Sequence, residues 1–92
     1  MAIMEWREVH PEQSNWKRQI NIVAYYGSKI GSIILCDDER SWNCMIDGNI
    51  DFLEAETEEE AKKEMIERLE ECFEEKINYY RELIDGLEKL SP

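Results

Sequence analysis

The sequence predicts an α+β domain, in which an antiparallel β-meander of three to five strands is followed by one long C-terminal α-helix. Two observations predict this fold: apolar residues alternate with period two in the first part of the chain, and they recur with the helical period of 3.6 in the last part. Ninety-two residues are enough for a single domain. We therefore expect one domain over 1–92, with the sheet in 1–56 and the helix in 57–90.

The first strands come from the N-terminal third of the chain. Residues 2–9 mix apolar and charged side chains, which predicts an edge strand, with a short helix as the alternative. The polar loop after them contains Pro11, which cannot donate to a ladder. Apolar residues then alternate over 20–26, and 27–29 form a short turn. The β-branched run 30–36 returns antiparallel to the segment before the turn.

A second hairpin is predicted downstream. Residues 42–46 form a strand, and Asp47-Gly48 is a strong signal for a type I′ turn, because both central residues of that turn need a positive φ. Ile50 and Phe52 then continue the meander on the far side of the turn. The sheet is expected to end there.

The period becomes helical at Thr57. Thr57 and Glu60 form a capping box, since the threonine hydroxyl accepts a backbone N–H and the glutamate reaches back. Neither glycine nor proline follows before Gly86. The apolar residues after the cap fall at intervals of three and four, and so lie on one helix face: Ile66, Leu69, Phe73, Ile77, Tyr80, Ile84 and Leu87.

The expected helix is too long for its sheet. Residues 57–90 span about 50 Å as one helix, whereas a seven-residue strand covers only about 23 Å. Either the helix breaks near 76–78 and folds back, or it continues and pairs with a second copy or, lying in a groove, with another protein. The absence of a strong breaker favours continuity. A homodimer is expected, with self-association through Phe73, Ile77, Tyr80, Ile84 and Leu87.

The charge is strongly negative. The chain has 22 acidic and 11 basic residues and a formal net charge of −11, which disfavours binding to nucleic acid or to an anionic membrane. The acidity either serves solubility or forms an electronegative face for a protein partner with a basic surface, such as a nucleic-acid-binding effector. The candidate partner-binding acids are Asp37, Asp38, Glu39, Glu70, Glu71, Glu74 and Glu75.

No pattern in the chain predicts catalysis. The three cysteines have no CxxC spacing, and His10 is the only histidine, so neither a metal site nor a Cys–His nucleophile is expected. Phosphate-binding glycine loops are also missing. The order Asp47…Glu60-x-Lys62 occurs in restriction-type nucleases, but there the Glu-x-Lys lies on a strand, whereas here it opens a helix. We expect no enzyme, no catalytic or metal-ligating residue and no cofactor.

The N-terminal residues predict no targeting segment. Charge appears at Glu5, which does not fit a signal peptide, and the longest apolar run, 22–26, is too short to span a bilayer. Free thiols also suit a reducing compartment. We expect a cytoplasmic protein.

Two resemblances follow from these features. The meander ending in Thr57-Glu58-Glu59-Glu60-Ala61-Lys62 resembles the three-strand-plus-helix domains of integrase arms and plant ethylene-response factors. Those families bind DNA through basic and aromatic sheet residues, and the acidity of this chain departs from that pattern.

The small size and negative charge are similar to those of phage and mobile-element inhibitor proteins of the anti-CRISPR and anti-restriction type. That resemblance implies a phage protein, acting in the host cytoplasm, that blocks a host nuclease or defence complex through an acidic surface. The alternative is a homodimeric structural or adaptor protein that acts through the apolar helix stripe.

Overall fold

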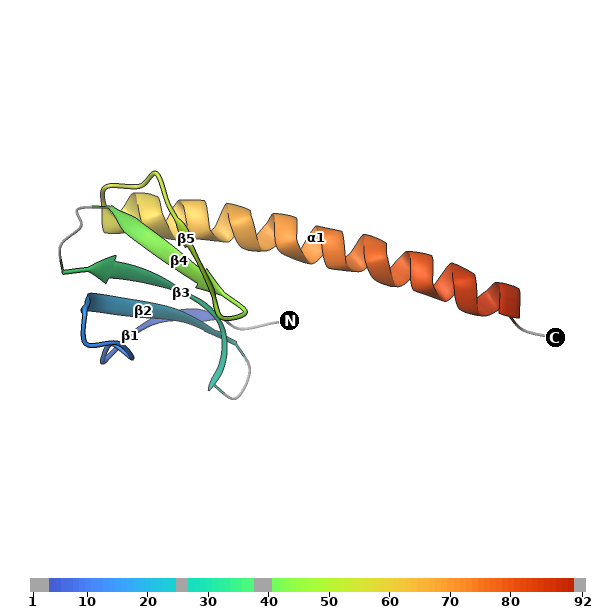
Figure 1. The fold of residues 1–92 in the computed structure, drawn as a ribbon, viewed down its shortest axis with the longest axis horizontal. Helices are drawn as coiled ribbons and strands as arrows, with labels where there is room; N and C mark the ends of the chain where they lie inside the picture. Colours follow the sequence, from blue (N-terminus) through green and yellow to red (C-terminus); the bar gives the residue numbers. More distant parts are fainter. Residues whose placement is uncertain (1–3, 25–26, 38–40, 91–92) are drawn as a thin grey trace.

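The computed structural model describes residues 4–24, 27–37 and 41–90. Its elements follow the order β1 (Glu5–Val9), β2 (Trp16–Ala24), β3 (Ser28–Cys36), β4 (Trp42–Ile46), β5 (Asn49–Phe52) and α1 (Glu58–Leu90). The five strands form one sheet in sequence order, and every neighbouring pair is antiparallel. Figure 1 shows this meander with one long helix crossing it. The predicted fold class is confirmed.

The β4–β5 hairpin turns where the sequence predicts. Asp47 has φ of 53° and Gly48 has φ of 80°, as a type I′ turn requires at both central positions. Ile46 and Asn49 are directly paired across the turn. This short connection fixes the register of β5 against β4.

The C-terminal helix is continuous over its 33 residues, so the alternative of a break near 76–78 is not realised. The molecule measures 58 × 27 × 23 Å. Its long axis is set by α1, which crosses the sheet with its first half and projects beyond the sheet with its second half (Figure 1). The length mismatch expected between helix and sheet is therefore present.

The start of α1 is fixed by local hydrogen bonds. The Glu60 N–H donates to Thr57 Oγ1 at 3.2 Å, and the Glu60 carboxylate accepts from the Glu56 N–H at 3.2 Å. The predicted capping box is thus formed, with its return bond one residue before the threonine. Glu64 adds a second anchor, because its carboxylate accepts from the backbone N–H groups of Glu54 and Ala55. These bonds set the direction in which the helix crosses the sheet.

The core lies between α1 and the face of the sheet that the helix crosses. Ala61, Met65 and Leu69 are the buried residues of the helix. They pack with apolar side chains of the sheet: Ile20, Ile22, Ile33, Trp42 and Cys44. At Gly31 the helix comes very close, since a Cβ there would collide with the Met65 side chain and lie 3.2 Å from the Met45 carbonyl oxygen. Glycine at this position allows the close helix–sheet contact.

The opposite face of the sheet contains buried polar side chains that bond to one another. Gln19 is fully buried and donates through Nε2 to Asn21 Oδ1 at 2.9 Å. The Ser32 hydroxyl donates to the same oxygen at 2.6 Å. The side-chain oxygen of Gln19, Oε1, in turn accepts from the Glu12 backbone N–H at 3.0 Å. These bonds attach the loop between β1 and β2 to the face of the sheet opposite α1.

Candidate protein-binding surface

The helix leaves the sheet at Lys76. The Lys76 ammonium donates to Asp47 Oδ2 at 3.3 Å, and this hydrogen bond raises the pKa of the lysine. Beyond it lie residues 77–90, here called the distal segment, which add about 21 Å of helix at 1.5 Å per residue. Every residue of the distal segment is exposed. The first part of α1 is therefore packed against the sheet, whereas the distal segment is exposed to solvent.

The distal segment is apolar on one face. Leu83 and Leu87 follow the buried Met65 and Leu69 by about five complete turns, so they continue the same side of the helix. The large apolar residues of the distal segment are between 45% and 80% exposed: Ile77, Tyr79, Tyr80, Leu83, Ile84, Leu87 and Leu90. Four of the five residues that the sequence predicts for self-association belong to this set. The fifth, Phe73, lies beside the sheet and is 39% exposed.

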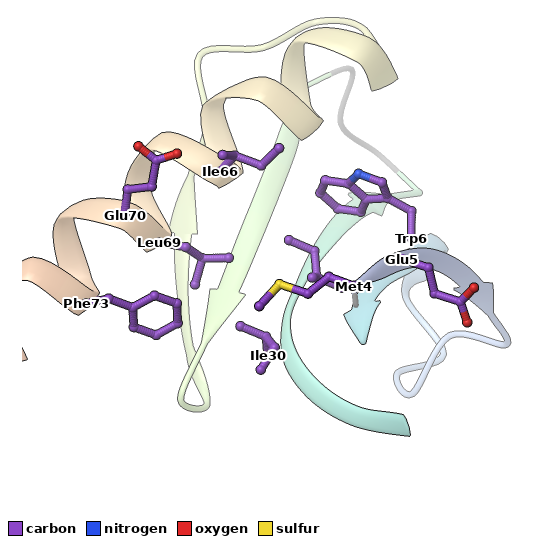
Figure 2. A pocket seen from close by; sticks show the side chains of 9 residues that line it. Met4, Glu5, Trp6, Ile30, Ile66, Leu69, Glu70 and Phe73 are labelled. Atoms are coloured by element: carbon purple, nitrogen blue, oxygen red, sulfur yellow. The ribbon is translucent and has the colours of Figure 1, made fainter. Parts of the chain in front are cut away.

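An apolar groove of about 430 Å³ runs between α1 and the β1 side of the sheet. Figure 2 shows Ile66, Leu69 and Phe73 on one wall, with Trp6, Met4 and Ile30 facing them. Ile22 also lines the groove. The groove is open to solvent along its length, since Met4, Ile66 and Phe73 are all exposed. It joins the apolar face of the distal segment, because Phe73 is one turn before Ile77.

The candidate acidic residues do not gather in one place. Asp37 is exposed at the end of β3. The helix α1 begins at this end of the sheet. Arg18 is paired with Leu35 near the end of β3, and it forms an ion pair with Glu58, the first residue of α1. The four candidate glutamates of the helix follow about 18 Å or more further along α1: Glu70, Glu71, Glu74 and Glu75. Asp38 and Glu39 lie outside the described residues.

The helix glutamates form an acidic surface of their own. All four are exposed, and within the described part of the chain none of them makes an ion pair. Glu71, Glu74 and Glu75 point away from the apolar face, as their positions on the helical wheel require. Glu70 differs, since it lies at the edge of the groove. Glu71, Glu74 and Glu75 thus lie on a different side of the helix from its apolar face.

An ionic cluster attaches the helix start to the sheet. The Arg18 guanidinium donates to both Glu8 oxygens at 2.9 and 2.7 Å, and it lies 2.7 Å from Glu58. The hydrogen bond from Arg18 lowers the pKa of Glu8, and hydrogen bonds from Lys62 and Arg18 lower that of Glu58. The guanidinium also lies 5.4 Å from the centre of the Trp42 ring. The cluster joins β1, β2 and α1.

This cluster predicts a pH-dependent stability. The ordinary carboxyl pKa is 4.5, and because the folded values are lower, the unfolded chain takes up protons first as the pH falls. The stabilisation is thus complete above pH 4.5 and is lost below it. Replacing Arg18 by methionine should lower the free energy of unfolding by about 1 kcal/mol at pH 7, since the pair is partly exposed. It should also make the decline below pH 4.5 shallower, as measured by urea unfolding.

Lys29→Met is the matched control for this prediction. It removes the same charge from a side chain that is 40% exposed and pairs only loosely with Glu12, at 3.4 Å. We expect it to keep the wild-type pH profile. Identical profiles for Arg18→Met and the wild type would contradict the assignment.

The remaining reactive side chains stay apart. Cys44 is buried, and burial raises the pKa of its thiol, while Cys36 and Cys72 are half-buried. Among the described residues, no three His, Cys, Asp or Glu side chains are placed to hold a metal ion. A membrane-spanning helix is likewise not found in the described ranges.

Comparisons with protein-family models, with curated proteins and with solved structures gave no match to this chain. The arguments for function therefore depend on the geometry of the chain itself. That geometry offers the distal segment, the groove and the acidic side of α1.

Sequence reasoning missed the groove. Met4 and Trp6 lie in the segment 2–9, and Ile30 begins the predicted strand over 30–36. The signals for it in the sequence are the helix stripe through Ile66, Leu69 and Phe73 and the apolar side chains within 2–9. The groove arises from where α1 crosses the sheet, and periodicity carries no information on that position.

Proposed function

We propose that this chain is a non-enzymatic, homodimeric structural or adaptor protein that associates through the distal segment of α1. One observation carries the proposal: the apolar face of α1 continues for about 21 Å past its own sheet. In the described chain nothing covers that face. Single exposed apolar residues are ordinary on a protein surface, whereas a continuous stripe is typical of an interface.

The area of the stripe fits a specific interface. The distal segment has seven large apolar residues, each at least 45% exposed. At roughly 100 Å² each they offer on the order of 700 Å² per chain, close to the ~800 Å² per partner of standard interfaces. Tyr79 and Tyr80, whose rings lie 5.7 Å apart, are of the residue type that most often anchors such contacts. The stripe is therefore large enough for a stable dimer.

A second function is favoured by the acidic side of the same helix. The glutamates Glu70, Glu71, Glu74 and Glu75 are exposed and free of ion pairs in the described chain. A surface of this kind attracts a basic, nucleic-acid-binding protein surface. An anti-CRISPR-like or anti-restriction inhibitor, encoded by a phage or mobile element and acting in the host cytoplasm, would use it in that way. A dimer would present the acidic surface twice.

Ionic strength gives the two functions opposite signatures. Association of two chains that each have a net charge of −11 is opposed by repulsion, which salt screens over a Debye length of about 10 Å at 0.1 M. We expect sedimentation equilibrium to show a particle of twice the chain mass of 11.0 kDa. The dimer Kd should fall by about 3- to 10-fold between 0.05 and 0.5 M NaCl. Binding to a basic partner should instead weaken with salt.

Two outcomes separate the functions. A chain that stays monomeric at high concentration and high salt would overturn the homodimer. A dimer whose binding to a basic partner does not respond to salt would overturn the acidic-surface inhibitor and leave the adaptor standing. A protein of similar size and opposite net charge is the control for nonspecific salt effects.

A further inference from the structure

One helix is too narrow to cover this sheet. An α-helix with its side chains is about 10–12 Å wide, while five strands at about 4.8 Å spacing extend about 19 Å from the first to the last. The main contacts of α1 with the sheet are to β3 and β4. The same face over β1 and β2 is left to the groove, which has room beside α1 for another element.

The wall of the groove that α1 provides is continuous with the distal segment. Ile66 and Phe73 face the groove, and Ile77, Tyr80 and Ile84 follow them along the same side of the helix at intervals of three and four. A second helix lying beside α1 would therefore contact one unbroken apolar row. That row begins in the groove and ends near the C-terminus.

We propose that the groove is filled by the distal segment of a second copy of this chain, with the two α1 helices antiparallel. This inference rests on the proposed homodimer and names its geometry. With a two-fold axis midway between Glu75 and Lys76, Ile84 reaches the level of the partner's Ile66 and Leu69. Each copy then lays its bare helix half over the sheet of the other, as an isologous interface requires.

Charge complementarity selects the antiparallel orientation. Four charged residues follow the groove edge of α1: Lys63, Glu70, Arg81 and Glu88. The same axis brings Lys63 level with the partner's Glu88, and Glu70 level with the partner's Arg81, so both pairs are of opposite sign. A parallel, in-register pair would place each residue level with its own copy, and so like charge with like.

The groove also adds area that the distal segment alone does not offer. Met4, Ile66 and Phe73 are 52%, 43% and 39% exposed. At the same roughly 100 Å² each, they raise the apolar area that a partner can cover from about 700 to about 1,000 Å² per chain, above the ~800 Å² per partner of a standard interface. A helix pair that crossed only at the distal segments would leave these three side chains in water.

Two substitutions at equally exposed positions test whether the groove is filled. Met4 lies in the groove and Ile50 lies on the opposite face of the sheet, and both are 52% exposed. We expect Met4→Asp to raise the dimer Kd at least about 10-fold in sedimentation equilibrium, because it leaves a carboxylate in an apolar contact. Ile50→Asp, which adds the same charge, should leave the Kd within about twofold.

A charge cycle tests the orientation. Glu70→Arg and Arg81→Glu should each raise the Kd about 5- to 10-fold, since each creates two like-charged pairs in the dimer, and the double variant should return to near the wild-type value. In a parallel dimer neither single variant would create a new like-charged pair, so failure of the cycle overturns the orientation. A dimer that is insensitive to Met4→Asp but broken by Ile84→Asp overturns the filled groove and leaves the proposed homodimer intact.

Discussion

Replacing Ile84 by aspartate is expected to turn the dimer into a monomer, with the Kd raised at least about 100-fold. Ile84 is 54% exposed in the single chain and contributes to the apolar face of the distal segment. Burying an isoleucine stabilises by about 1.5–3 kcal/mol, and the two-fold dimer contains the residue twice. Aspartate removes both contributions and adds two carboxylates that need water. Sedimentation equilibrium over a range of concentrations measures the change.

Asn78→Asp is the matched control for Ile84→Asp. Both variants add one carboxylate to the distal segment, but Asn78 lies on the polar side of the helix. Only the substitution on the apolar face should weaken the dimer. The helical circular dichroism of both variants should match the wild type, because both positions lie beyond the sheet of their own chain. Equal weakening by the two variants would show that charge alone, and not the apolar stripe, controls association.

The second large effect is expected in the core. Met65 has no exposed surface and packs against Gly31 at the centre of the helix–sheet contact. Met65→Ala should reduce the free energy of unfolding by about 2–5 kcal/mol, which combines lost burial with the cavity left behind. A domain of this size has a total stability of about 5–14 kcal/mol. A fall in Tm of more than about 10 °C is therefore expected.

Ile66→Ala separates packing from helix propensity in this experiment. Ile66 is the next residue along the helix but faces the groove and is 43% exposed. In the monomer its loss should reduce stability by less than about 1.5 kcal/mol. Both substitutions are best made in the Ile84→Asp background, so that dissociation does not enter the thermal midpoint. Equal losses from Met65→Ala and Ile66→Ala would contradict the position of α1 on the sheet.

These experiments separate two roles of one helix. The face that holds the domain together at Ala61, Met65 and Leu69 continues into the face proposed to join two copies at Leu83 and Leu87. Substitutions in the first half should change the stability of the single chain, and those in the second half should change the mass of the particle. The hydrogen bond from Lys76 to Asp47 marks the boundary between them.

Local chemistry predicted most of the fold. Three predictions depend on side chains close together in sequence: the strand over 20–26, the Asp47-Gly48 turn and the cap at Thr57. The structure has β2 over Trp16–Ala24, and it has both the turn and the cap, while 25–26 lie outside the described residues. The continuity of α1 follows from the lack of any breaker between the cap and Gly86. Its excess length over the sheet follows from the rise per residue. The exposed apolar stripe could thus be predicted without coordinates.

The sequence by itself therefore determined the order of the elements and the existence of an apolar face too long for its own sheet, because periodicity and helix rise are local properties. Only the tertiary structure decided which strands α1 covers. Two contacts at distant positions accompany that choice: Met65 packs against Gly31 of β3, and Arg18 of β2 forms an ion pair with Glu58 at the helix start. The groove beside Met4 and Trp6 is a result of that choice, since it is formed by residues distant in sequence whose meeting no local pattern encodes.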